Sequence, residues 1–167
     1  MLPPELVTNF IRGIVVYLFL YLFLYEFQPV YQYGQNMVTV IFRFFSPLVK
    51  VAPFVLPIFS LMALVVFYFS TFIFRSKEIG YAFMFLVSFM FTMHMVSTAK
   101  ALRSRDNNAA KPDYFFSISL IYAINIFILA LMFDLILPDF SFPDFFKTAT
   151  GMTGHIYKSA FNQLFVP

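Results

Sequence analysis

The sequence contains no cysteine and no tryptophan, and charged residues make up only 11% of its 167 positions. The lack of cysteine excludes disulfides, thiolate metal sites, iron–sulfur clusters and a cysteine nucleophile. The basic residues do not form a stripe that could bind a phosphate backbone, so we expect no nucleic-acid partner. Phosphate-binding glycine loops and a Ser/His/Asp arrangement are also missing. We therefore expect a protein that is not an enzyme, with no catalytic, cofactor-binding or metal residues.

Apolar and aromatic side chains are abundant instead. The chain has 27 Phe and 10 Tyr, is 61% hydrophobic and has a mean hydropathy of +0.82. Soluble domains are roughly half apolar and a quarter charged, and they cannot bury this much aromatic surface. The composition predicts an all-α integral membrane protein that forms a single polytopic domain over residues 1–167.

Four apolar runs are long enough to cross a bilayer. The first begins after Arg12 and ends without the small residues that a signal peptidase needs, so we expect it to remain as a membrane anchor. Only the residues 75–78 separate the second run from the third, which predicts an antiparallel helical hairpin. The expected transmembrane helices lie at about 10–27, 53–74, 79–99 and 114–137.

The connection after the first span has the pattern of an amphipathic helix over residues 36–50. Its polar residues recur at steps of three and four and include Arg43 and Lys50, whereas Phe45 belongs to the apolar face. Two cations make a transmembrane position costly. We expect this helix to lie in the headgroup plane, or against an apolar partner subunit, with Arg43 and Lys50 facing anionic lipid.

A second amphipathic helix is predicted over residues 142–165. Ser141 followed by Asp144 matches a capping box, with Pro143 in the first turn. Phe146 lies on the apolar face of the predicted helix, which keeps helical spacing over its whole length. We expect this helix, too, to lie at the membrane surface.

Polar side chains inside the spans are candidate interaction residues. Tyr17, Tyr21 and Tyr25 follow one another at intervals of four and form one stripe. A phenol at mid-depth requires a hydrogen-bond partner that lipid does not supply, so the stripe should face protein rather than lipid. A contact with a quinone or another ligand is the alternative to packing.

The last span has a polar face of its own. Ser119, Tyr122 and Asn125 share one side of the helix, and Asn125 falls near its centre. Such residues form interhelical hydrogen bonds in membranes, and a polar substrate path is the alternative interpretation. Asp134, close to the end of the span, is expected to meet headgroups or a cation of a partner.

A group of methionine and histidine residues near the end of the third span fits either a copper site or ordinary packing. Met90, Met93 and His94 share a helix face, and thioether and imidazole groups suit Cu(I). Methionine also fills irregular gaps in apolar cores, and no second methionine cluster continues a copper path. We therefore favour packing.

Together these patterns favour a non-catalytic subunit that packs against other membrane proteins and stabilises a larger complex, such as a respiratory or secretion-type assembly. The alternative is a small transporter or channel that works as a homo-oligomer, with Cu(I) transport a remote option. A pore would bring Ser88, Thr92, Ser119 and Asn125 onto one water-lined surface. The bacterial cytoplasmic membrane and the mitochondrial inner membrane both fit, and the loop cations weakly favour both termini outside.

Overall fold

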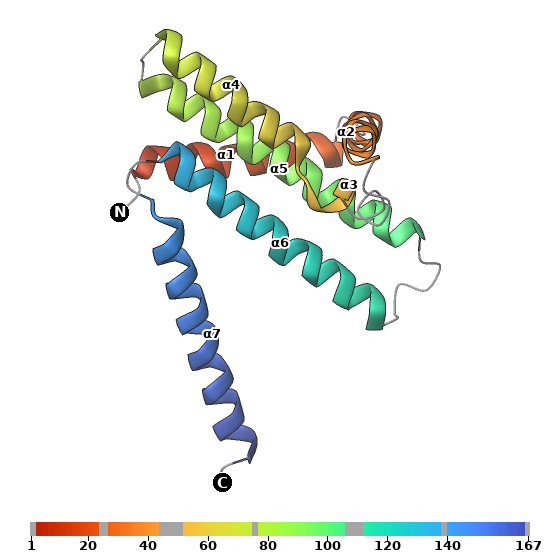
Figure 1. Cartoon of the computed structure of the whole chain (residues 1–167), viewed down its shortest axis with the longest axis vertical. Coiled ribbons are helices and arrows are strands. Elements are labelled where there is room, and N and C mark those ends of the chain that lie inside the picture. The colour runs from red at the N-terminus through yellow and green to blue at the C-terminus, as the bar shows by residue number, and fades with distance from the viewer. Residues whose placement is uncertain are drawn as a thin grey trace. The chain divides into compact units, whose positions relative to one another are not determined.

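The computed structural model describes residues 3–23, 27–43, 52–74, 77–105, 112–137 and 140–165 (Figure 1). Regular secondary structure within these ranges is helical throughout, as the sequence predicts. The helices are α1 (Pro4–Phe23), α2 (Gln28–Ile41), α3 (Ala52–Val55), α4 (Ile58–Phe74), α5 (Lys77–Arg105), α6 (Pro112–Ile136) and α7 (Phe142–Phe165).

Three helical segments are long and apolar enough to cross a membrane: Pro4–Phe23, Ile79–Arg103 and Phe115–Ile136. They correspond to the first, third and fourth predicted spans, and they indicate a membrane protein. The apolar segment Ile58–Ile73 is shorter. At 1.5 Å per residue, α4 alone does not reach the roughly 30 Å of a hydrocarbon core. The structure therefore does not confirm four spans.

The chain divides into two compact units, Met1–Ile128 and Leu129–Pro167, with the boundary inside α6. In the first unit, α5 is the central helix: α1 and α4 pack along it, and α2 contacts α3, α4 and α5. Tyr17, Val38, Met84 and Val87 are almost fully buried in this core. The second unit contains the last turns of α6 and the whole of α7. The expectation of a single domain remains a prediction.

The helices α1 and α5 approach each other closely at Gly13. A Cβ atom on this glycine would collide with the Ser88 Oγ and with the backbone carbonyl oxygen of Phe85. Glycine is therefore required here, because it allows two helix backbones to approach more closely than any side chain permits.

The bounds of the first span differ from the prediction of 10–27. The helix α1 begins earlier because Pro4, which lacks a backbone N–H, fits the first turn of a helix. Thr8 and Asn9 then donate side-chain hydrogen bonds to the carbonyls of Pro4 and Glu5. Arg12 lies within the helix, as the predicted range also has it, and is exposed.

The second predicted helix, at 36–50, overlaps the described structure only in part: residues 36–41 lie in α2, and residues 44–50 lie outside the described residues. The helix α2 begins with Pro29 in its first turn, and Ile41 is its last residue. Proline fits this position because the first N–H groups of a helix have no intrahelical partner. The predicted residues Phe45 and Lys50 lie outside the described residues, whereas Arg43 lies two residues after the end of α2 and is exposed.

The third predicted span, 79–99, is shorter than the helix that contains it. Lys100 and Arg103, which we expected in a loop, belong to the last turns of α5. Ala99, Ala101 and Leu102 are good helix formers, and cations are favoured near a helix C-terminus. The helix thus extends beyond its apolar segment.

The predicted hairpin between the second and third spans is confirmed. The helices α4 and α5 pack together, and Figure 1 shows them lying side by side. The rings of Phe67 and Phe83 meet edge to face at 5.0 Å between centroids. The predicted span 53–74, however, is not one helix: α3 and α4 are separated by Leu56 and Pro57.

The start predicted for the last helix is confirmed. The backbone N–H of Asp144 donates to the Ser141 Oγ at 3.4 Å, and the Phe145 N–H donates to the Ser141 carbonyl at 3.0 Å. The side chain of Asp134 adds a cap that we did not predict, since its Oδ1 accepts the N–H of Phe142 at 2.7 Å. No residue of α7 is buried.

Candidate functional site

The break between α3 and α4 exposes a backbone carbonyl to side-chain donors. Pro57 has no N–H to donate, and the Ile58 N–H bonds to the Leu56 carbonyl at 2.9 Å. In a continuous helix, this Ile58 N–H would bond to the carbonyl of Phe54, four residues earlier. The Phe54 carbonyl therefore accepts hydrogen bonds from side chains of other helices.

Two buried side chains donate to this carbonyl. The Nε2 of His94, on α5, lies 3.1 Å from the Phe54 oxygen, and the Nδ2 of Asn125, on α6, lies 3.3 Å from it. Because a carbonyl only accepts, the hydrogen bond assigns a proton to His94 Nε2. Asn125 is fully buried and His94 is 5% exposed. One carbonyl oxygen thus connects α3, α5 and α6.

A second set of hydrogen bonds joins α2 to α5 beside this point. The hydroxyl groups of Tyr31 and Thr98 lie 2.8 Å apart, and the Gln35 Nε2 donates to the Tyr31 hydroxyl at 2.7 Å. The Tyr31 ring also lies 5.8 Å from the His94 ring. We call Gln35, Tyr31, Thr98, His94, Asn125 and the Phe54 carbonyl the buried polar cluster.

The hydrogen-bonding capacity of the cluster is not fully used. Asn125 Nδ2 also donates to the Ile121 carbonyl at 2.9 Å, but its Oδ1 has no hydrogen-bond partner among the described residues. The buried Ser60 Oγ on α4 has none either within that part of the chain. A buried acceptor without a donor costs about 1–3 kcal/mol. The cluster therefore holds helices together but is not optimised for stability.

The tyrosine stripe of α1 is distributed over different environments. Tyr17 is fully buried, and its ring stacks on Tyr21 at 6.0 Å and meets Phe27 and Phe89 at 5.2 and 5.3 Å. The Ser97 side chain lies beside its hydroxyl, which makes no hydrogen bond of ordinary geometry among the described residues. Tyr21 is half-buried, and Tyr25 lies outside the described residues.

The polar residues predicted on the last span do not form one site. Asn125 belongs to the buried polar cluster, and the half-buried Tyr122 donates to the Met95 carbonyl at 3.3 Å. Ser119 is exposed. In the second unit, Phe146 of α7 is 46% exposed. Of these predicted interaction residues, some form hydrogen bonds inside the chain and the others lie on its surface.

Several residues of the cluster escaped sequence analysis. Sequence patterns indicate His94 only as a candidate copper ligand or a packing residue, and they single out neither Tyr31 nor Thr98. Two sequence signals could have indicated them. One is a polar residue inside an apolar segment, and the other is the pair Pro53 and Pro57, whose missing N–H groups leave backbone carbonyls without helical donors.

The structure places His94 and Met93, two members of the methionine and histidine group, in the core. His94 directs its Nε2 to the Phe54 carbonyl, and Met93 is 3% exposed in the core. No group of three or more His, Asp or Glu side chains gathers within reach of one metal ion in the described part of the chain.

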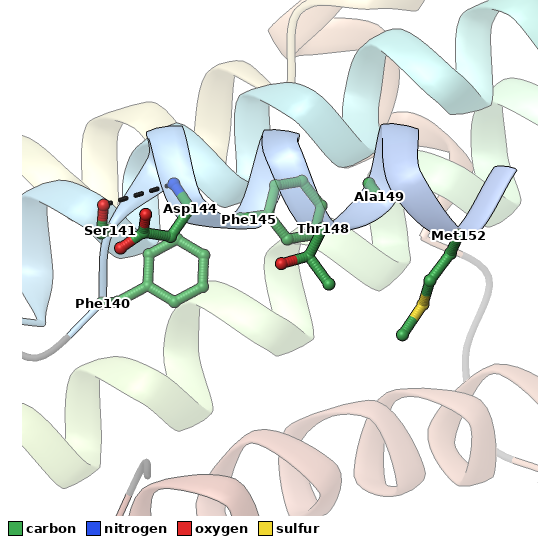
Figure 2. Close-up of a pocket in the computed structure, with 7 residues that line it drawn as sticks. All are labelled: Phe140, Ser141, Asp144, Phe145, Thr148, Ala149 and Met152. Atoms are coloured by element: carbon green, nitrogen blue, oxygen red, sulfur yellow. Dashed lines mark hydrogen bonds between the residues drawn. The ribbon is translucent and has the colours of Figure 1, made fainter. Parts of the chain in front are cut away.

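The second unit has a pocket where α7 begins. Its volume is about 430 Å³, and Figure 2 shows its residues along one side of the first three turns of the helix. The rings of Phe140 and Phe145 lie 6.0 Å apart, and Phe140 also meets Phe133 of α6 at 5.9 Å. We call this site the elbow pocket; it is lined by Phe140, Ser141, Asp144, Phe145, Thr148, Ala149 and Met152.

The chain was compared with protein families, curated proteins and solved structures. Neither a family model, nor a curated protein, nor a solved structure matches the chain. What the chain does must therefore be argued from the geometry of the buried polar cluster, the elbow pocket and the exposed apolar faces.

Proposed function

We propose that this chain is a non-catalytic membrane subunit that packs into and stabilises a larger membrane protein assembly. The observation that carries the proposal is that its intramembrane polar groups are engaged separately. Ser88 donates to the Phe85 carbonyl beside Gly13, Thr92 donates to the Ser88 carbonyl, and Asn125 donates to Phe54. Ser119 is exposed on another helix. A water-lined path would require these groups on one surface.

In this proposal, four segments cross the bilayer, with α3 and α4 together forming the second crossing. Irregular backbone is tolerated at membrane depth only where protein or water satisfies its polar groups. The donors from His94 and Asn125 meet this condition at the Leu56–Pro57 break. The packing of α4 along α5, including Phe67 on Phe83, also supports a second crossing.

The proposal assigns α2 and α7 to the membrane surface. The helix α7 has Phe146, Ile156 and Leu164 on one face and Lys158 and Asn162 on the other, and all five are exposed. Its apolar face must be covered by lipid or a partner subunit, because an isolated helix with this much exposed apolar surface is unfavourable in water. After the end of α2, exposed Arg43 would meet anionic headgroups, together with Lys50 further along the chain.

The test compares two charged variants of α7. Phe146→Asp places a carboxylate on the apolar face, whereas Asn162→Asp adds the same charge to the polar face. For a scaffold subunit in its native membrane, Phe146→Asp should reach the membrane in normal amounts but lose its co-purifying subunits, and Asn162→Asp should keep them. Mass spectrometry after mild solubilisation measures both.

Two results would overturn the proposal. One is a wild-type chain that purifies only with copies of itself. The other is rapid labelling by a water-soluble thiol reagent of cysteines placed singly at Ser88, Thr92 and Asn125, which would indicate one hydrated surface. Either result would favour a homo-oligomeric transporter or channel.

A further inference from the structure

The elbow pocket combines an acidic group with aromatic and apolar walls. The backbone N–H of Asp144 donates to the Ser141 Oγ. The side chain of Asp144 is exposed and lines the pocket with its carboxylate. Figure 2 shows this carboxylate beside Ser141, above the Phe140 ring in that view, with Phe145 and Met152 further along the helix. One end of the pocket is therefore acidic and the rest is apolar.

The position of the pocket along the chain determines which ligands it meets. It begins at Phe140, four residues after Ile136, the last residue of a candidate membrane span. Four residues cover at most about 14 Å, so the pocket opens near the level of the lipid headgroups. A ligand there has acyl chains on one side and water on the other.

The charge at this end favours a cation. The chain has a second carboxylate at the start of this helix, since the Asp134 Oδ1 accepts the N–H of Phe142 in its first turn. The rings of Phe140 and Phe145 add aromatic surface, which attracts cations. A primary ammonium would also donate hydrogen bonds to the carboxylate, and such charge-assisted bonds are stronger than neutral ones.

We propose that the elbow pocket binds a phospholipid with a primary ammonium headgroup, namely phosphatidylethanolamine. The ammonium lies at the Asp144 carboxylate, and the Ser141 and Thr148 side chains border the polar part of the headgroup. Ala149 and Met152 contact the start of the acyl chains. The volume of about 430 Å³ lies within the range of small-ligand sites. The site does not depend on the proposed function, because a scaffold subunit and a transporter would both present it to the bilayer.

The test is a lipid titration of the full chain in detergent, followed by native mass spectrometry. Phosphatidylethanolamine, phosphatidylcholine and phosphatidylglycerol with identical acyl chains are compared. The wild type should retain the first lipid in preference to the other two. Asp144→Asn should lower its retention about three- to fivefold, as expected for one exposed charge pair, and should leave phosphatidylcholine binding unchanged. Glu5→Gln, which removes a carboxylate from the first unit, is the control.

A second measurement locates the lipid. A photoreactive phosphatidylethanolamine should cross-link to the segment 140–152 in the wild type, and to a smaller extent in Asp144→Asn. The proposal is overturned if all three lipids bind equally, if Asp144→Asn binds phosphatidylethanolamine like the wild type, or if the cross-links fall outside this segment. Loss of partner subunits is not scored here, so failure of this proposal is distinct from failure of the proposed function.

Discussion

His94 and Asn125 donate hydrogen bonds to the same backbone oxygen, the carbonyl of Phe54, from two different helices. The arrangement is possible because the helix is interrupted at Leu56 and Pro57. The Ile58 N–H donates to the Leu56 carbonyl there and leaves the Phe54 carbonyl to other donors. A proline interruption inside an apolar run thus becomes a point of attachment for α5 and α6.

The first prediction concerns this shared acceptor. Asn125→Leu should lower the stability of the purified chain by about 1–2 kcal/mol, because it removes a buried hydrogen bond. Ser119→Leu, an exposed change on the same helix, should stay within about 0.5 kcal/mol of the wild type. Thermal unfolding in detergent measures both.

A double-mutant cycle extends this prediction. His94→Phe combined with Asn125→Leu should give a non-additive loss, with a coupling of at least about 0.5 kcal/mol, since both side chains share one acceptor. Strict additivity of the two losses would show that the two donors act independently.

The second prediction concerns the close contact of α1 with α5. Gly13→Ala should destabilise the chain by about 1–3 kcal/mol, because the new Cβ would collide with Ser88 and with the Phe85 carbonyl. Gly80→Ala is a matched control on α5, where a Cβ meets nothing within 4 Å. Replacing that glycine should be neutral or stabilising by up to about 1 kcal/mol. Equal melting temperatures for the two variants would contradict the packing.

The third prediction separates two tyrosines on one helix. Tyr31→Phe leaves Thr98 and Gln35 without the hydroxyl group that they share, and it should cost about 1–3 kcal/mol. Tyr33→Phe changes a side chain that is 72% exposed and should have little effect on the isolated chain. A cluster that carries no stability would leave the unfolding of both variants unchanged.

The fourth prediction concerns the start of α7. Asp134→Ala removes the acceptor for the Phe142 N–H, and loss of a helix cap costs about 1 kcal/mol. Hydrogen exchange of the amides at 142–145 should therefore accelerate. Asp134→Asn keeps a side-chain oxygen and should retain most of the protection, which separates the hydrogen bond from the charge. If the alanine variant exchanged like the wild type, Asp134 would have no role as a cap.

The fifth prediction tests that α5 crosses the bilayer. The chain has no cysteine, so Gly80→Cys and Arg103→Cys each introduce a single thiol. The two positions lie about 35 Å apart along the helix, and they should react with a membrane-impermeant reagent from opposite sides. Reaction of both from one side would exclude α5 as a span.

The amino-acid sequence is sufficient to predict the membrane environment, the helical class and the approximate number of long apolar segments. Composition alone excludes a soluble domain, and the bilayer obliges the backbone to form helices. The start of α7 could also be predicted, because Ser141 and Asp144 act within one turn. Such local signals require no knowledge of distant parts of the chain.

The contacts between polar residues of different helices, by contrast, follow from the packing of the folded chain. The pairing of Tyr31 with Thr98 spans 67 residues, and that of Asn125 with Phe54 spans 71. Helical periodicity specifies which face of a helix a residue occupies, but it does not specify the neighbouring helix. The same holds for Gly13, whose spacing contains no motif and whose role depends on where α5 passes. The proline break was visible in the sequence, whereas the donors that satisfy its carbonyl were determined by packing.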